Sequence, residues 1–516
     1  MAGPATESGS YEEETSKTAA PGIDRILFGA CVVVIVGACV PMALFPEQAS
    51  VVVTGLYDWI AGEIGLLYQW VTLAATIVLA VLAFGKYGRR RLGGDDATPE
   101  FGNLSWMAML FCAGIGAGLL YWSAIEWAFY LDAPPFGLEG GSPEAREWSA
   151  TYGIFHWGLS AWCLYCLPTV AIAWPYYQRR IGSLRLSTAL VGLFGDDVVH
   201  RPIGRAVDFV FVIALVGGTG TSLGLATPMI AASVSALFGI PESHTLDVGI
   251  VFLAVALFAF SVYRGLERGI RRLSDINVWI AGGFALFVLV VGPTGFQLEL
   301  GTNSLGLMLQ EFIRLNTWTD PILQTGFVED WSIFYWAWWL AYGPYMGLFV
   351  TRISRGRTLK QLILGMVGFG TLGCALFYIT VGNAAMWMDM EGIVAVRELV
   401  AAGSADTAIA QVVAALPLQP LPLIAFIVMA LIFVATTYDS ASYAIAGSVT
   451  RHLPAGVNPH RANRVFWAFA LALLPITLLI VGGLRAIQSA VLVVSLPLLA
   501  IGVAMTVSLF RSLRTA

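Results

Sequence analysis

The sequence has little charge for its length. Of its 516 residues, 12% are charged and 58% are hydrophobic. This charged share is about half of what soluble proteins carry. A soluble core cannot bury so much apolar surface with so few charges, so we expect lipid to surround most of the chain. The apolar runs also leave no soluble stretch long enough for an enzyme domain.

Cysteine is scarce, and its distribution excludes a disulfide framework. Cys163 and Cys166 have the C-x-x-C spacing of zinc ligands, but no nearby His or Cys completes such a site. No nucleophile–base set is evident either, so we predict no enzyme activity and no organic or metal cofactor. We interpret the six cysteines as small packing residues: Cys31, Cys39, Cys112, Cys163, Cys166 and Cys374.

A cleavable signal peptide is absent from the start of the chain. Residues 1–24 are polar and include four glutamates, which predicts a disordered cytoplasmic tail. We expect one membrane domain over 25–511 and a cytoplasmic stub over 512–516.

Apolar stretches recur along the chain, each about 20 residues long and able to cross a bilayer. They predict twelve spans, which lie near 25–45, 61–84, 104–130, 149–177, 206–238, 246–263, 275–295, 328–351, 360–386, 419–448, 463–484 and 487–510. The connections 296–327 and 387–418 contain helix-patterned pieces at 305–313 and 394–401, which we expect on the outer surface.

The distribution of Lys and Arg supports this count independently. With a cytoplasmic N-terminus, the inward connections and tails contain nearly all of the 28 basic residues. Only four fall outside: Arg146, Arg314, Arg397 and Arg485. A missed span would invert every later loop, so we expect twelve spans with both termini inside.

Two spans contain helix-breaking residues. Span 3 has Gly114, Gly116 and Gly118 within an apolar run, and span 8 has Gly343-Pro344. Such residues interrupt membrane helices where the backbone lines a cavity, although Gly114 and Gly118 also fit close packing of small residues. Spans 3 and 8 begin two sets of five, 3–7 and 8–12. An odd number gives the sets opposite orientations, as in inverted-repeat transporters whose sites lie at helix breaks.

Aromatic residues concentrate beside these breaks. Span 8 begins with a run from Trp331 to Tyr342, deeper than an interfacial belt requires, and span 4 adds Trp157, Trp162 and Tyr165. Trp162 and Tyr165 share a helix face, whereas Trp157 lies about 140° from Trp162 on a continuous helix. Core packing and interfacial belts are the alternative explanation. Beside a helix break we favour recognition of quaternary ammonium, which aromatic faces attract.

At these residues the sequence resembles the betaine/carnitine/choline transporter family. The resemblance covers about 25–511. It rests on 109–118 (MLFCAGIGAG), on 331–345 (WSIFYWAWWLAYGPY) followed by 351–358 (TRISRGRT), and on 436–442 (TTYDSAS). It implies an all-α LeuT-type fold with a 5+5 inverted repeat behind two peripheral helices. It also implies a homotrimer in the bacterial inner membrane.

The resemblance further implies a substrate site. The substrate-binding residues would be Trp157, Trp162, Tyr165, Trp338, Trp339 and Tyr342, together with the backbone of Gly114, Gly116 and Gly118. Tyr342 departs from sodium-coupled betaine carriers, which usually have Trp there, and is similar to carnitine exchangers. Gly118 stands where some choline carriers have Asp, so we favour zwitterions over choline. A substrate carboxylate would meet backbone N–H groups at the broken span 3.

The coupling ion implied by the resemblance is sodium. One site would use Thr436 and Thr437, completed by Cys112, Ile115 and Phe433; a weaker second site would use Thr219 and Ser222, with Thr221 as a further hydroxyl and Tyr345 nearby. A membrane Thr pair also commonly bonds its own helix. Arg272 and Met346 favour the alternative, because they are similar to residues that replace sodium ions in exchangers. Arg272 is also one of four arginines in an inward loop.

Glu126 and Asp439 are the notable intramembrane carboxylates, and intramembrane charge points to function by default. Each lies beside a break or polar patch, so we expect it to satisfy backbone groups rather than relay protons. We predict a sodium symporter importing glycine betaine or a related compatible solute for osmoprotection. Sodium-independent carnitine exchange is the main alternative. A betaine sensor is weaker because no signalling domain is present.

Overall fold

The computed structural model describes residues 22–515, except 114–115, 180, 182–183, 265–266, 452, 454–457 and 483. Regular structure in this part of the chain is helical. Its β pairing is limited to two isolated bridges, Ile23 with Thr450 and Arg91 with Thr358. The prediction of an all-α protein is therefore confirmed.

The described part of the chain begins with a shorter and a longer helical stretch. α1 covers Arg25–Leu44, and the Asp24 side chain caps it by accepting a hydrogen bond from the Leu27 N–H at 3.4 Å. α2 (Pro46–Trp59) and α3 (Gly65–Phe84) join through the π turn η1 (Ile60–Ile64). Together they make a continuous helical stretch of 39 residues, which begins well before the span predicted at 61–84.

Both of the next two predicted spans are interrupted. Span 3 consists of α4 (Asn103–Ala113) and α5 (Ala117–Asp132), with Gly116 in extended backbone before α5. Span 4 consists of α6 (Pro143–Trp157) and α7 (Leu159–Gln178), separated by non-helical Gly158. The short turn η2 (Pro135–Gly137) links the two spans. The predicted break in span 3 is confirmed, whereas the break at Gly158 is an addition.

The central part of the chain holds the longest helix and a sharp corner. η3 (Leu186–Leu190), α8 (Val191–Phe194) and η4 (Asp196–His200) lead to α9 (Pro202–Phe238). α10 (His244–Arg264) and α11 (Glu267–Val291) follow. α12 (Thr294–Gln310) leaves α11 at 112° and continues to α13 (Phe312–Thr317), so the helical piece predicted at 305–313 is present.

The second half begins with η5 (Val328–Ile333) and α14 (Phe334–Ile353). α15 (Leu359–Phe377) has a capping box at Thr358 and continues through η6 (Tyr378–Gly382) into α16 (Asn383–Met390). The connection then forms α17 (Val396–Ala401) and α18 (Ala405–Ala414). α19 (Leu421–Ser448), α20 (Arg461–Val481) and α21 (Leu484–Thr515) complete the chain.

The predicted interruption of span 8 is wrong, because α14 runs without a break through Pro344. Proline removes one helical N–H, but membrane helices tolerate this where neighbouring elements support the backbone. Gly343 and Gly347 provide that support by letting α14 meet the backbone of α7. A Cβ at Gly343 would lie 3.0 Å from the Leu164 carbonyl oxygen, and one at Gly347 would lie 3.1 Å from the Thr169 nitrogen.

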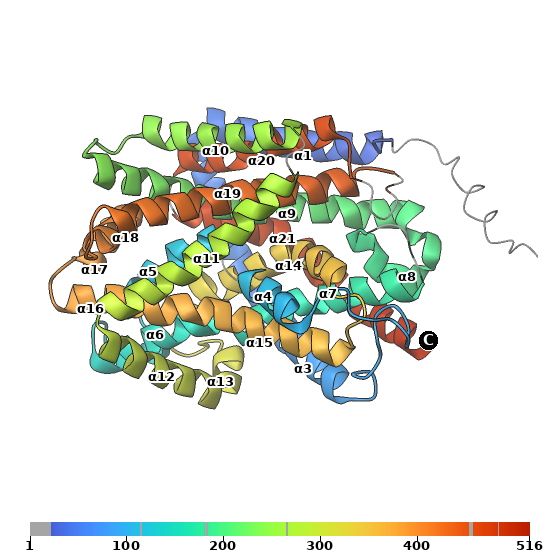
Figure 1. Ribbon diagram of the computed structural model, residues 1–516, viewed down its shortest axis with the longest axis horizontal. Coiled ribbons are helices and arrows are strands. Elements are labelled where there is room, and N and C mark those ends of the chain that lie inside the picture. The colour runs from blue at the N-terminus through green and yellow to red at the C-terminus, as the bar shows by residue number, and fades with distance from the viewer. Residues whose placement is uncertain are drawn as a thin grey trace, which may run out of the picture.

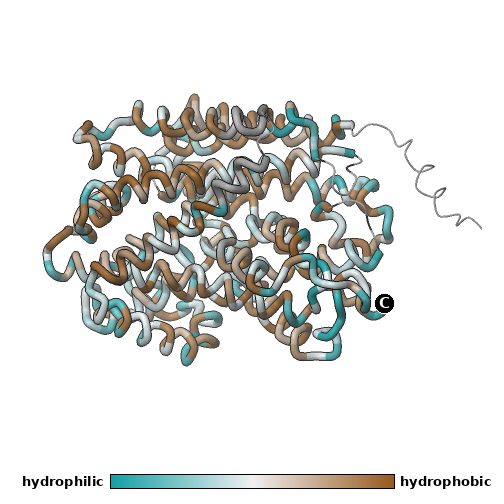
Figure 2. The backbone as a smooth tube through the Cα atoms, viewed as in Figure 1, coloured by the Kyte–Doolittle hydropathy of each residue, from teal (hydrophilic) through white to brown (hydrophobic). Residues whose placement is uncertain are grey.

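The helices run side by side, and α14 packs against α7 near the middle of the molecule (Figure 1). α1 and α10 both pack on α20 along one edge, while α12 and α13 lie at the opposite edge. Hydrophobic residues dominate the long helices, and hydrophilic residues gather at the turns (Figure 2). This pattern suits helices whose flanks meet lipid or one another.

Eight helical stretches of the described residues are long and apolar enough to cross a membrane, or nine if the bent pair Asp275–Val291 and Thr294–Gln310 is one span. The eight are Arg25–Leu44, Pro46–Phe84, Pro143–Gln178, Pro202–Phe238, Leu359–Met390, Leu421–Ser448, Arg461–Val481 and Leu484–Thr515. The break in span 3 leaves helices of 11 and 16 residues, each shorter than the ~20 that a bilayer requires.

Candidate functional site

Four aromatic side chains from three helices form a continuous buried cluster. Trp338 and Trp339 of α14 stack with ring centroids 5.1 Å apart. Trp157, the last residue of α6, meets them edge-on at 5.8 and 4.7 Å. Tyr165 of α7 contacts Trp339 at 5.6 Å. The structure therefore brings together four of the predicted substrate-binding residues, which we call the aromatic cluster.

Backbone carbonyls fix the orientation of two of these rings. The Trp339 indole N–H donates to the His156 carbonyl at 2.8 Å, and that of Trp338 donates to the Gly218 carbonyl at 3.3 Å. Both polar edges are thus satisfied away from the cluster, as buried indoles require. The ring faces pack on neighbouring rings, with Trp338 and Trp339 stacked on each other and on Tyr335.

Trp157 joins the cluster because span 4 is not one continuous helix. Gly158 has φ −96° and ψ −134°, which ends α6 and restarts the chain as α7. The angle of about 140° between Trp157 and Trp162 assumed a single helix, so it does not describe their directions. The signal that sequence reasoning missed was Gly158 itself, directly after Trp157.

The Trp162 ring lies between Tyr165 and α15. It contacts Tyr165 at 5.3 Å, which confirms that the two share a helix face. The same ring packs against Gly370 of α15, where a Cβ would overlap it. Trp162 therefore supports Tyr165 from behind, and Tyr165 is the one that meets the α14 rings.

The broken span 3 reaches the cluster at Gly118. A Cβ there would lie 3.3 Å from Cη2 of Trp338 and 3.5 Å from Cη2 of Trp157. Gly116 opens α5, and a Cβ there would meet no atom within 4 Å. Gly114 and Ile115 lie outside the described residues, as does the side chain of Cys112. The start of α5 thus faces the rings across a glycine.

Tyr342 lies one turn further along α14 and contacts α9. Its hydroxyl is 3.0 Å from the Ser222 hydroxyl, and its ring covers Gly218, where a Cβ would be 3.0 Å away. Tyr345 meets Tyr342 at 5.9 Å between centroids. Ser222 and Tyr342 therefore form a polar contact between α9 and α14, close to the Gly218 carbonyl that holds Trp338, and the Tyr345 ring packs beside it.

The hydroxyls predicted to bind sodium bond their own helices. Thr436 donates to the carbonyls of Ile432 and Phe433 at 2.9 and 3.1 Å, and Thr219 donates to the Leu215 carbonyl. A donating hydroxyl keeps lone pairs that can bind a cation. Thr221 also bonds its own helix. Phe433 and Met346 are buried, and Thr437 is half-buried. The Arg272 side chain lies outside the described residues.

Behind Trp157 a fully buried carboxylate collects several donors. Glu126 of α5 accepts hydrogen bonds from the hydroxyls of Tyr130 and Tyr378, and from the Trp157 indole N–H at 3.1 Å. The Tyr130 hydroxyl also meets His156 Nδ1 at 2.8 Å. The expectation that Glu126 satisfies backbone groups is wrong, because its partners here are side chains from α5, α6 and η6.

The second intramembrane carboxylate has a different environment. Asp439 of α19 forms an ion pair with Arg464 of α20 at 2.9 Å, and its side chain is partly exposed. The guanidinium neutralises this carboxylate within a helix pair. Asp439 is therefore part of the scaffold between α19 and α20.

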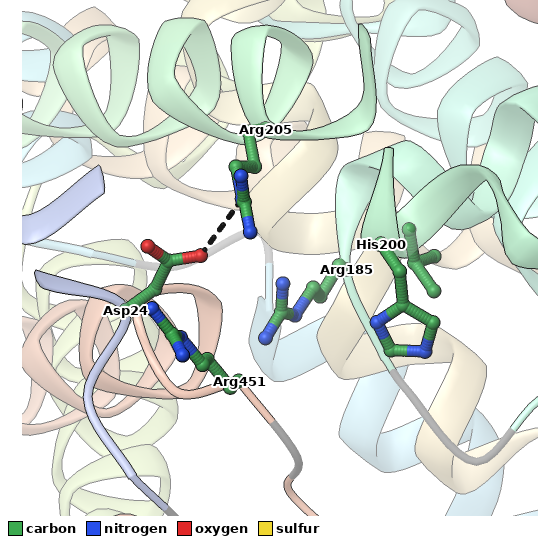
Figure 3. Close-up of a pocket in the computed structure, with 6 residues that line it drawn as sticks. Asp24, Arg185, His200, Arg205 and Arg451 are labelled. Carbon is green, nitrogen blue, oxygen red and sulfur yellow. Dashed lines mark hydrogen bonds and ion pairs between the residues drawn. The ribbon is translucent and has the colours of Figure 1, made fainter. Parts of the chain in front are cut away.

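A cavity of about 220 Å³ lies apart from the aromatic cluster and has the wrong charge for an ammonium ligand. Asp24, Arg185, His200, Arg205 and Arg451 line it (Figure 3). Arg205 donates to Asp24 at 3.0 Å, and the buried Arg185 pairs with Asp208 at 3.5 Å. This group of ion pairs ties the start of α1 to α9 and would repel a cation.

Comparison with known proteins identifies the family. The sequence model of the betaine/carnitine/choline family of transporters matches residues 26–516. The chain belongs to this family. It is also similar to the uncharacterized transporter YeaV of Escherichia coli strain K12, with 36% identity over 432 residues, 84% of this chain and 89% of the relative.

Membership settles the general activity. The protein is a multi-pass membrane protein and a secondary transporter of betaine-, carnitine- or choline-type substrates, not an enzyme. Its substrate is a small molecule that the membrane separates into two pools. The aromatic cluster is then the part of the described structure whose chemistry suits a quaternary ammonium group.

Proposed function

We propose that this protein imports a zwitterionic quaternary ammonium solute, such as glycine betaine, together with sodium. The observation behind the proposal is the aromatic cluster at the start of α5, formed by Trp157, Tyr165, Trp338 and Trp339. A trimethylammonium group cannot donate hydrogen bonds, so aromatic faces recognise it best. Each face contributes ~0.5–2 kcal/mol.

The rings in this arrangement are in contact, so binding requires them to separate. Trp157 and Trp339 lie 4.7 Å apart, which leaves no room for a cation between them. A cation–π contact needs up to about 6 Å from the cation to each ring centroid. We therefore expect substrate binding to change the tryptophan fluorescence, and W338A or W339A to weaken binding by at least tenfold.

We also propose the membrane arrangement in which this cluster works. It consists of twelve spans, of which spans 3–7 and 8–12 form an inverted repeat behind two peripheral helices. The inward connections contain most of the Lys and Arg residues, which favours a protein of the bacterial inner membrane with both termini in the cytoplasm. By likeness to the family we expect a homotrimer.

For coupling we propose sodium at Thr436 and Thr437, completed by the Phe433 carbonyl and the end of α4. Thr436 lies beside Phe433 on α19 and keeps acceptor lone pairs while it donates to its helix. For a second site we propose the hydroxyls of Thr219 and Ser222 on α9, with Tyr345 of α14 nearby. Sodium prefers such uncharged and carbonyl oxygens over nitrogen or sulfur.

The test is uptake of radiolabelled glycine betaine into proteoliposomes, with and without an inward sodium gradient. Each condition uses empty vesicles and vesicles preloaded with carnitine. We expect uptake into empty vesicles that requires sodium, and we expect T436A/T437A to raise the sodium concentration for half-maximal uptake by about tenfold. The matched control is S448A, which removes another hydroxyl of α19 and should leave the sodium dependence unchanged.

Two results would overturn parts of the proposal. Uptake that ignores sodium and requires preloaded substrate would make the protein an exchanger, with Met346 and Arg272 as the candidates that replace the ions. Absence of binding or uptake of any quaternary ammonium compound would reject the aromatic cluster as the substrate site.

A further inference from the structure

We propose that Glu126 sets the preference of the aromatic cluster for a positively charged head group, acting through the Trp157 indole. This proposal rests on the substrate class proposed above. Glu126 does not line the cluster itself; it lies behind Trp157 and is fully buried. Its role is to tune a recognition ring, not to touch the substrate.

The hydrogen bonds around Glu126 suit an ionised carboxylate, which is the form that this proposal assigns to it against the cost of burial. Its two oxygens accept from Tyr130, Tyr378 and Trp157, and the indole N–H can only donate. Several donors converging on a buried carboxylate stabilise its charged form. No Lys or Arg of the described residues forms an ion pair with it, so in this part of the chain it has no permanent counter-charge.

His156 is the titratable group that could offset this charge. Its Nδ1 lies 3.7 Å from Glu126 and 2.8 Å from the Tyr130 hydroxyl, while its Nε2 lies 3.0 Å from the Ser332 hydroxyl. A neutral imidazole satisfies both contacts: Nδ1–H donates to Tyr130, Tyr130 donates to Glu126, and Ser332 donates to Nε2. With Glu126 ionised, this arrangement places one net negative charge behind the aromatic cluster.

The route from the charge to the substrate is the Trp157 ring. A carboxylate that accepts the indole N–H polarises the indole and makes its face more negative, which strengthens attraction of a cation. Trp157 meets Trp339 at 4.7 Å and Trp338 at 5.8 Å, so the polarised ring is part of the cluster.

The measurement compares two ligands of the same shape. Glycine betaine carries a trimethylammonium group, and 3,3-dimethylbutanoate carries a tert-butyl group in its place. Dissociation constants of both are measured on the full-length protein in nanodiscs, for the unmodified chain and for E126Q. We expect E126Q to raise the dissociation constant of glycine betaine by about tenfold and to change that of 3,3-dimethylbutanoate by less than about twofold.

Further variants separate charge from packing. E126D keeps the charge and shortens the side chain, so it should retain more of the betaine preference than E126Q. W157F keeps a ring but removes the indole N–H. If the charge acts through that bond, E126Q should add less than twofold to the loss caused by W157F. Size-exclusion profiles confirm that each variant is folded.

Three results would overturn the inference, each in a different way. If E126Q weakens the binding of both ligands equally, Glu126 has only a structural role. If E126Q/W157F binds glycine betaine a further tenfold more weakly than W157F alone, the charge does not act through Trp157. If the unmodified protein binds neither glycine betaine nor carnitine, the proposed substrate class fails and the inference fails with it.

Discussion

Two glycine-containing membrane segments form different structures. In span 3, helix α4 ends at Ala113 and α5 begins at Ala117, whereas α14 continues through Gly343, Pro344 and Gly347. The surroundings differ more than the residues. The α14 glycines meet the backbone of α7, while Gly116 has open space around it. The α14 glycines therefore serve close packing, whereas Gly116 lies at the break.

The largest expected effect is a loss of stability when a side chain is added between α14 and α7. In G343V, the added side chain would meet the Leu164 carbonyl and Pro168, which lie 3.0 and 3.3 Å from a Cβ. Overpacking of this kind costs ~1–3 kcal/mol. We expect a clearly lower thermal midpoint, measured by fluorescence-detected size-exclusion chromatography.

The matched control is G368V on α15, because a Cβ at Gly368 would meet no atom within 4 Å. It should leave the thermal midpoint close to that of the unmodified protein. Equal destabilisation by G343V and G368V would contradict the view that α14 and α7 are in backbone contact.

A smaller effect, on transport rather than folding, should follow from G118A. The new methyl group would lie 3.3 Å from Trp338, so that ring must shift by a few tenths of an ångström, and it would be in ordinary contact with Trp157 at 3.5 Å. We expect kcat/KM for uptake to fall by about tenfold, equivalent to ~1.4 kcal/mol, while the thermal midpoint changes little.

For G118A the control is G306A on α12, where a Cβ would have no neighbour within 4 Å. Uptake by G306A should match the unmodified protein. Full activity of G118A would mean that the start of α5 is not close to the rings when substrate binds.

The smallest effect is expected from P344A. Because α14 is already continuous, alanine restores the N–H that proline lacks and leaves the helix path unchanged. We expect uptake within about threefold of the unmodified protein and a stability change below ~1 kcal/mol. A loss of transport beyond tenfold would indicate that α14 breaks at this position in another state of the cycle.

Much of the helical pattern could be predicted from the sequence, since hydrophobic runs of membrane length have few alternatives. The break at Gly116 and the shared face of Trp162 and Tyr165 were correct. The errors came from tertiary neighbours. The uninterrupted α14 depends on Leu164 and Thr169 of another helix, which no local pattern reveals.

The site was predicted in part, for the same physical reason. Trp157, Tyr165, Trp338 and Trp339 were identified by their chemistry and by resemblance, and the structure places them in contact. The partners of Glu126 were not predictable, because Tyr378 lies 252 positions away in the sequence. A charge can be located from the sequence, but the groups that surround it require the fold.

The close contact between α7 and α14 restricts how this transporter can move. Gly343 and Gly347 let α14 lie directly against the α7 backbone, with no side chain between them at these points. We expect the pair to move as one body that keeps Tyr165, Trp338 and Trp339 in one frame. Alternating access must then come from relative motion between this body and elements such as α9, which contacts it through side chains and the Gly218 carbonyl.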